Sequence, residues 1–177
     1  MINCRPKRNF TLTACLIIGI FISLSFNEDA NRLGDQYNSL RTGATPYAHC
    51  YGKNASCSSY GCSEIKVKAP LNSDVMVTVK KNRKVIKHAY IRRGSYYTFQ
   101  VKNGSYQTFF YYGYDWDPNK VMKTGTTCGT IKGGFRNGET FGKDDPVYLS
   151  NQQLYYELIL QQNGNFSTKP SNKYEAF

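Results

Sequence analysis

Residue types that carry most catalysis and metal binding are scarce in this sequence. Its 177 residues include two histidines, one tryptophan and three methionines, and 12 acidic residues face 23 lysines and arginines. No glycine-rich stretch ends in Gly-Lys-Ser or Gly-Lys-Thr, which excludes a phosphate-binding loop of that type. Charged residues make up only 20% of the chain and prolines number six, so the composition is neither disordered nor collagen-like. These absences leave one folded domain and no set of residues that specifies a reaction.

Aromatic residues are abundant instead. The chain has 15 tyrosines and 10 phenylalanines, and these residue types suit the half-buried surface of a sheet. Apolar residues alternate with polar ones in several short runs, as expected for strands buried on one face. We therefore predict an all-β fold, an antiparallel β-sandwich of six or seven strands with a disulfide-stapled N-terminal loop. The predicted strands cover residues 65–68, 75–80, 85–91, 97–101, 105–112 and 154–162.

The strand at 105–112 carries aromatic residues on both faces, so we expect it to be central in a sheet. Asn103-Gly104 before it predicts a two-residue hairpin with the strand at 97–101, and residues 115–119 predict a turn after it. Residues 124–145, rich in Gly and Thr, predict a long excursion held by a cysteine. The expected core between two sheets contains Tyr97, Phe99, Val101, Tyr106, Phe110, Tyr156 and Leu158.

The N-terminus has the layout of an export signal, because three basic residues lie among the first eight and residues 10–26 are largely apolar. The small residues Ser23 and Ser25 predict cleavage after Ser25, and the alternative is an uncleaved membrane anchor formed by residues 10–26. Both readings place the folded part outside the cytoplasm, in the periplasm, on the cell surface or in the medium. The expected organisation is a signal peptide or signal anchor at 1–26, a disordered linker at 27–48, the β-sandwich at 49–166 and a frayed C-terminal tail at 167–177.

Four cysteines, Cys50, Cys57, Cys62 and Cys128, lie in the part expected to be exported. An even number in an oxidising compartment predicts two disulfides. Since three of the four are close in sequence, one bridge must reach Cys128 if all pair, and all three connectivities stay open. The alternative is a zinc site made with His49, although the spacing lacks the Cys-x2-Cys pair of most structural zinc sites. We therefore expect disulfides, and neither a metal nor another cofactor.

One segment resembles a known type of module. The run Gly94-Ser95-Tyr96-Tyr97-Thr98-Phe99-Gln100-Val101-Lys102-Asn103-Gly104-Ser105-Tyr106-Gln107-Thr108-Phe109 is similar to the hairpin of prealbumin-like and carboxypeptidase-regulatory-like β-sandwich modules. Ile65 to Pro70 also resembles the first strand of the related PEGA surface modules. The resemblance covers about 50 residues and departs at Lys102-Asn103, where the family proline is expected. It implies a small exported accessory or binding module and brings no catalytic residues with it.

Basicity is the strongest sign of a partner. Residues 66–102 contain ten basic residues and a single acidic one, Asp74. Exposed basic residues of paired strands would form a cationic stripe that contacts anionic envelope lipid or polysaccharide, or another envelope protein. Export argues against nucleic acid, although the aromatic residues could stack on bases. The alternative is that the lysines only protect strand edges and keep the domain soluble. The predicted stripe consists of Lys80, Arg83, Lys84, Lys87, Arg92 and Arg93.

Few residues are available for catalysis. Only His49 and His88 are ordinary bases, and His88 lies in a strand pattern where a structural imidazole is expected. Asp115 and Asp117 could bind calcium, but the glutamate that such a loop needs at its twelfth position is absent. With Glu157 they could instead form the paired carboxylates of a secreted hydrolase. We expect a non-enzymatic binding or structural module with no catalytic residues, and the hydrolase is the alternative.

Overall fold

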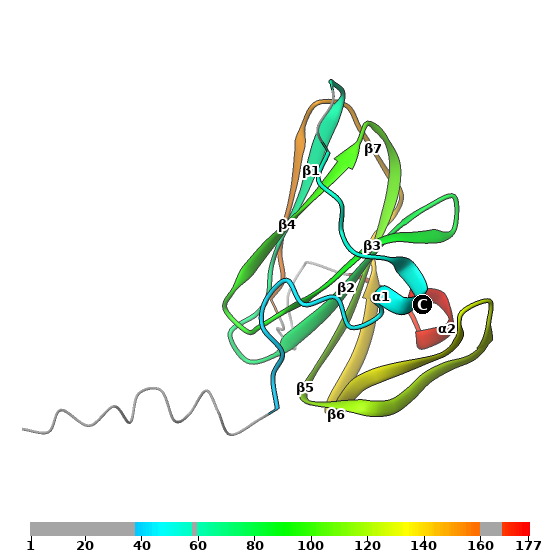
Figure 1. Ribbon diagram of the computed structural model, residues 1–177. Helices are drawn as coiled ribbons and strands as arrows, with labels where there is room; N and C mark the ends of the chain where they lie inside the picture. The colour runs from blue at the N-terminus through cyan, green and yellow to red at the C-terminus, as the bar shows by residue number, and fades with distance from the viewer. Residues whose placement is uncertain (1–37, 58–59, 160–167) are drawn as a thin grey trace, which may run out of the picture.

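The computed structural model describes residues 38–57, 60–159 and 168–177, and most of them form strands (Figure 1). The predicted signal at 1–26 lies outside the described residues, as do the last residues of the strand predicted at 154–162. No helix in the described part of the chain has the length and hydrophobicity needed to cross a bilayer. The elements are α1 (Ala48–Tyr51), β1 (Cys62–Lys68), β2 (Asp74–Lys81), β3 (Lys84–Ile91), β4 (Tyr96–Lys102), β5 (Gly104–Thr126), β6 (Gly129–Lys143), β7 (Val147–Leu149), β8 (Gln153–Glu157), β9 (Lys169–Pro170) and α2 (Lys173–Ala176).

The strands form two sheets, which confirms the predicted β-sandwich, but the described residues contain nine strands rather than six or seven. The first sheet has the order β4-β1-β8, and the second has the order β3-β2-β5-β6-β9, with β7 paired to the start of β5. Pairing is antiparallel except between β1 and β8, which are parallel. The strand 105–112 is part of β5 and lies in the middle of the second sheet, as its two aromatic faces predict.

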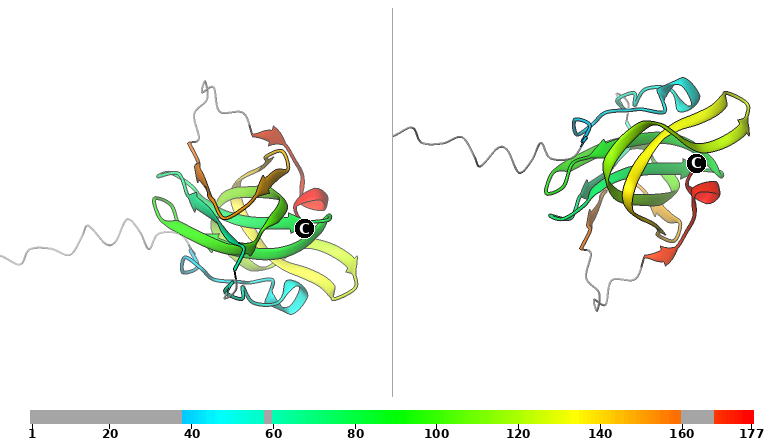
Figure 2. Two further views of the ribbon diagram at one scale, coloured as in Figure 1. Left: turned by 90° about the horizontal axis from the view of Figure 1, so that it is seen from above. Right: turned by 90° about the horizontal axis from the view of Figure 1, so that it is seen from below.

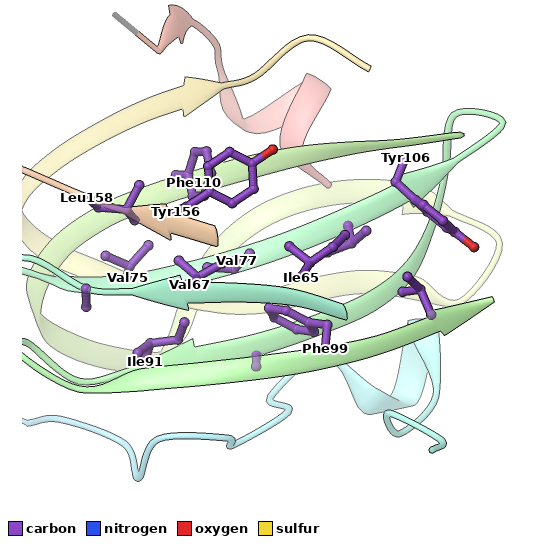
Figure 3. Close-up of a cluster of buried hydrophobic side chains, with 14 of the residues drawn as sticks. Ile65, Val67, Val75, Val77, Ile91, Phe99, Tyr106, Phe110, Tyr156 and Leu158 are labelled. Carbon is purple, nitrogen blue, oxygen red and sulfur yellow. The ribbon is translucent and has the colours of Figure 1, made fainter. Parts of the chain in front are cut away.

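The interior between the sheets is the larger of two cores (Figure 3). Ile65 and Phe99 of the first sheet point toward Val77 and Phe110 of the second sheet, and all four are at most 1% exposed. The predicted core is confirmed: Phe99, Val101, Tyr106, Phe110, Tyr156 and Leu158 are buried there, and Tyr97 packs against them half-buried. Alternation along each strand therefore places the apolar face inward, as the period of two requires.

The turn at Asn103 differs from the prediction, because β4 and β5 do not form a hairpin. β4 pairs with β1 in the first sheet, whereas β5 pairs with β2, β6 and β7 in the second. Gly104, with φ of 151°, is where the chain crosses from one sheet to the other. Both strands direct their apolar residues into the same interior. The alternation of apolar and polar residues is therefore the same whether β4 and β5 are neighbours in one sheet or lie in opposite sheets.

The β5–β6 hairpin is another difference. The predicted turn at 115–119 and the predicted excursion at 124–145 are wrong, since β5 continues to Thr126 and β6 returns from Gly129 to Lys143. The pairing has several register shifts, which bend a ribbon and increase its twist. The hairpin curls so that its inner face covers part of the second sheet (Figure 1).

A second core lies on the outer side of the second sheet, away from the first sheet. It is closed by residues 38–57, here called the N-terminal strap, and by α2 (Figure 2). The described part of the predicted linker is therefore packed rather than disordered, with Tyr47 fully buried. The predicted C-terminal tail is likewise ordered where it is described, with Phe177 only 4% exposed. Each segment carries a few apolar side chains in a polar stretch, which is too weak a pattern to indicate packing.

The N-terminal strap also covers the free edge of β3. The main chain of Tyr90 donates to the Ala44 carbonyl and accepts from the Gly43 N–H, both at 2.8 Å. The Asn54 side chain donates to the His88 carbonyl at 2.8 Å and accepts from the His88 N–H at 3.1 Å. These contacts satisfy strand groups that would otherwise be open to another chain.

Candidate functional site

The six residues of the predicted stripe do not form one continuous surface. Lys80, Arg83 and Lys84 lie where β2 turns into β3, whereas Arg92 and Arg93 follow the other end of β3. At about 3.3 Å per residue, the two groups are roughly 25–30 Å apart. Lys87 lies between them and is half-buried, with its ammonium donating to the Ala55 carbonyl of the N-terminal strap.

Two stripe residues instead join a hollow formed at the second sheet. The hollow has a volume of about 370 Å³ and lies between β2, β5, β6 and α2. Four cationic side chains and one acidic side chain line it, beside three aromatic residues, Phe109, Tyr174 and Phe177. We call this the cationic hollow and define it by Lys80, Arg83, Phe109, Lys123, Lys143 and Glu175.

Lys80 enters the hollow because of the strand period. It is on the same face of β2 as Met76 and Thr78, which point into the second core, and it is only 9% exposed. Its ammonium lies 4.9 Å from the centroid of the Phe109 ring and donates to the Glu175 carbonyl. A buried ammonium is tolerated here because it has both a ring face and a carbonyl as partners.

The other cations come from separate elements. Arg83 occupies the β2–β3 turn with φ of 64° and is exposed. Lys123 of β5 donates to the main-chain oxygens of Tyr174, at 3.3 Å, and Phe177. Lys143 of β6 contacts both carboxylate oxygens of Glu175, at 2.9 and 3.0 Å. The β5–β6 pairing and the docking of α2 therefore bring these charges together.

Among the side chains that line the hollow, four are cationic and only that of Glu175 is anionic. Burial, and next the ammonium of Lys123, lower the pKa of Lys80 to about 8, and Glu175 offsets this only in part. The hydrogen bond from Lys143 lowers the pKa of the Glu175 carboxyl, followed by the bond from Ser171. An anion placed among these cations would relieve their mutual repulsion, so the hollow is suited to binding one.

The structure does not bring Asp115, Asp117 and Glu157, the carboxylates of the predicted hydrolase, together as a general acid and a general base. Asp115 and Asp117, on β5, both contact Arg136, at 3.8 and 3.4 Å. Glu157 is on β8 in the first sheet and pairs with Lys68 at 2.7 Å. The N–H of Asn119, and next Arg136, lower the pKa of Asp117, which is the wrong direction for a general acid.

The four predicted disulfide cysteines pair as Cys50–Cys128 and Cys57–Cys62. One bridge therefore reaches Cys128, as expected, and joins the N-terminal strap to the tip of the β5–β6 hairpin. His49 lies with Cys50 and Cys128 in a cluster whose ligand atoms are within 4.8 Å of one another. Both sulfurs of that cluster are committed to the disulfide, and the other two cysteines pair with each other, so the four-residue zinc set is not assembled.

Two of the four cations in the hollow could not be found by sequence reasoning. Lys123 and Lys143 lie in the stretch 120–145, where glycine and threonine hide the strand pattern. The local charge excess at 66–102 indicates only Lys80 and Arg83. The other two come close through the pairing of Phe109 with Lys143 and through α2, contacts that join distant parts of the chain.

Comparisons with known proteins identify no relative for this chain. No protein-family model, no curated protein and no solved structure matches it.

Proposed function

We propose that this domain is an exported, non-enzymatic binding module that holds anionic groups of an acidic polysaccharide in the cationic hollow. The observation that carries the proposal is the meeting of Lys80, Arg83, Lys123 and Lys143 around a single acidic side chain, that of Glu175. Coulomb attraction in a partly buried site is stronger than at an open surface, because the effective dielectric constant is lower. A sulfate, phosphate or carboxylate on a polymer therefore gains more in the hollow than at scattered lysines.

Two further features support a polysaccharide outside the cytoplasm. Two disulfides are formed, which is typical of oxidising compartments, and the N-terminal sequence has the layout of an export signal. The hollow is recessed and mixes cations with the Phe109 and Tyr174 rings. A recess of this kind fits single anionic groups along a flexible polymer better than it fits the flat surface of a bilayer.

The test is retention of the domain on immobilised acidic polysaccharides, one carboxylated and one sulfated, with neutral dextran as control. Binding should weaken as salt rises from 0.1 to 1 M, because the Debye length falls from about 10 Å to about 3 Å. The double variant Arg83→Gln/Lys123→Gln should lose retention at low salt. The matched variant Lys53→Gln/Lys132→Gln removes two exposed charges elsewhere and should keep it.

Thermal unfolding of both double variants separates lost binding from lost structure, since Lys123 also contacts α2. Equal retention on dextran and on the acidic polymers would contradict the proposal. Sedimentation with anionic vesicles, without retention on either acidic polysaccharide, would reassign the hollow to lipid headgroups.

A further inference from the structure

The outer face of the first sheet carries a regular array of polar and aromatic side chains. Ile65, Val67 and Phe99 point into the core, so their neighbours along β1 and β4 point outward. The register places Thr98, Lys66 and Tyr155 in one row across β4, β1 and β8. The row on one side consists of Gln100, Glu64 and Gln153. The row on the other side consists of Tyr96, Lys68 and Glu157. We call these three rows the outer face.

Two tyrosine rings stand on this face with much of their surface open. Tyr96 is 62% exposed and Tyr155 is 48% exposed, although both belong to strands of a packed sheet. The Lys66 ammonium lies between them, 4.5 Å from the Tyr96 centroid and 5.7 Å from the Tyr155 centroid. One cation is thus in contact with a ring from the strand on either side of β1.

Lys66 differs from its neighbour Lys68 in having no acidic partner. Lys68 pairs with Glu157 at 2.7 Å, and Glu64 accepts from the Gln153 amide at 2.7 Å. Within the described residues, no carboxylate lies within ion-pair distance of Lys66. The outer face carries two basic residues, Lys66 and Lys68, and two acidic residues, Glu64 and Glu157, so its charges balance overall. Lys66 is therefore a local positive charge without an ion pair among the described residues, flanked by two rings and surrounded by groups that can donate or accept hydrogen bonds.

Hollows lie at both ends of the face. One, of about 320 Å³, is bordered by Lys68, Glu157 and the exposed side chains of Leu71 and Ile159. The other, of about 270 Å³, is bordered by Glu64 and Gln153. The outer rows are four residues apart along β1, or about 13 Å, so the face and its hollows form an extended surface that is long enough for several sugar units.

We propose that the outer face binds an acidic glycan, with pyranose rings packed on Tyr96 and Tyr155 and the acidic group of a sugar on Lys66. The C–H groups on one side of a pyranose are weakly positive and suit the negative face of an aromatic ring. The sugar hydroxyls suit the carboxylates and amides of the rows beside them. A carboxylate or sulfate on the sugar supplies the charge that Lys66 lacks.

This site is separate from the cationic hollow, which is built on the second sheet. It deepens the proposed function by identifying where sugar rings are recognised, whereas the hollow attracts charge alone. The two sites are distinguished by their side chains: the outer face depends on Tyr96, Tyr155 and Lys66, and the hollow depends on Arg83 and Lys123.

The experiment is calorimetric titration of the disulfide-bonded domain with tetrasaccharides of galacturonate, of methyl-esterified galacturonate and of a sulfated sugar. Tyr96→Ala and Tyr155→Ala should each weaken binding of the acidic tetrasaccharides about five- to tenfold, as the loss of one aromatic contact implies. Lys66→Gln should weaken the acidic sugars and leave binding of the methyl ester unchanged. Tyr148→Ala removes a ring that is 67% exposed on β7, and it should have no effect.

Circular dichroism and thermal unfolding of each variant show whether the sheet is intact. Failure of the wild-type domain to bind any of the three tetrasaccharides overturns the inference. Binding that is lost in Arg83→Gln/Lys123→Gln and kept in the tyrosine variants also overturns it, while leaving the hollow as the binding site. Loss in the tyrosine variants alone supports the outer face.

Discussion

The imidazole of His88 is stacked on the ring of Tyr47, with centroids 5.7 Å apart and planes at 25°. Tyr51 meets the same imidazole edge-on at 5.7 Å, so His88 of β3 is enclosed by aromatic residues of the N-terminal strap. The side chain is fully buried, and neither ring nitrogen has a hydrogen-bond partner among the described residues. Burial lowers the pKa of His88 to about 4. The backbone of Thr45, close to the imidazole but outside hydrogen-bonding geometry, offsets this in part, and the nearby His49 reinforces it.

The first prediction is that His88 makes the domain less stable in mild acid. The pKa of His88 is about 4 when folded, below the ordinary value of about 6.5, so the unfolded chain takes up the proton first. The effect of His88 on the free energy of unfolding should therefore be absent above about pH 6.5. As the pH falls from 6.5 to 4, the free energy of unfolding should decrease by about 3 kcal/mol in all. Urea unfolding at several pH values measures this loss.

The matched variant for that prediction is His88→Phe, which keeps an aromatic ring against Tyr47 and removes the titrating group. Carboxylates also titrate in this window. The contribution of His88 is therefore the difference between the wild type and the variant in how steeply the free energy of unfolding changes with pH. His49→Gln alters the exposed histidine and should keep most of the wild-type slope. Identical slopes for the wild type and His88→Phe would show that His88 is solvated.

The second prediction is that the two disulfides contribute unequally. Cys50–Cys128 closes a loop with a sequence separation of 78, and Cys57–Cys62 closes one of five. Loop-closure entropy then gives about 4.5 kcal/mol for the long bridge and about 2 kcal/mol for the short one. Denaturant unfolding of Cys50→Ser/Cys128→Ser and Cys57→Ser/Cys62→Ser compares them. A smaller loss for the long bridge would mean that the strap and the hairpin stay close in the unfolded chain.

The third prediction concerns the core between the sheets. Phe99 is 1% exposed and its ring lies 4.8 Å from that of Tyr97. Phe99→Ala should lower the free energy of unfolding by about 3–5 kcal/mol, through lost burial and the cavity that remains. Lys102→Ala, at an exposed position of the same strand, should change it by less than about 0.5 kcal/mol. Equal effects of the two variants would contradict the observed register.

The fourth prediction concerns glycines of β6. A Cβ at Gly133 would lie 2.6 Å from Cζ2 of Trp116, and φ there is 111°. Gly129 has a similar φ of 92°, but a Cβ there would meet no atom within 4 Å. Gly133→Ala should therefore lose about 1–3 kcal/mol more than Gly129→Ala, because overpacking adds to backbone strain. Thermal unfolding of the two variants gives the difference, and equal losses would show that Trp116 moves aside freely.

The strands with regular alternation could be predicted from sequence, and β6 could not. Val75, Val77 and Val79 mark β2 because one face of that strand is buried and alternation reports burial directly. β6 has glycines where Trp116 and Met122 press against its backbone. β6 is a strand because it pairs along the long edge of β5. The side chains of β6 itself therefore give little indication that it forms a strand.

Only the charged residues of the candidate site that lie close together in the sequence could be predicted. Lys80 and Arg83 belong to a segment with an evident basic excess. Lys143 joins them through the docking of Glu175, 32 positions further along the chain. In the sequence Lys66 is only one more basic residue, and its place between two tyrosine rings depends on the pairing of β1 with both β4 and β8. A pattern within one strand contains no information about which strand becomes its neighbour.

The parallel β1–β8 pair also determines when the first sheet can be completed during synthesis. Glu64 of β1 is paired with Gln153 of β8, 89 positions later. The ribosome therefore releases β1 long before its partner exists, and one edge of β1 stays open while the second sheet is already able to pair. Long-range pairing of this kind slows folding and prolongs the time during which an unpaired edge can meet another chain. A nascent chain of this protein should pair β2, β3, β5 and β6 before it completes the outer face.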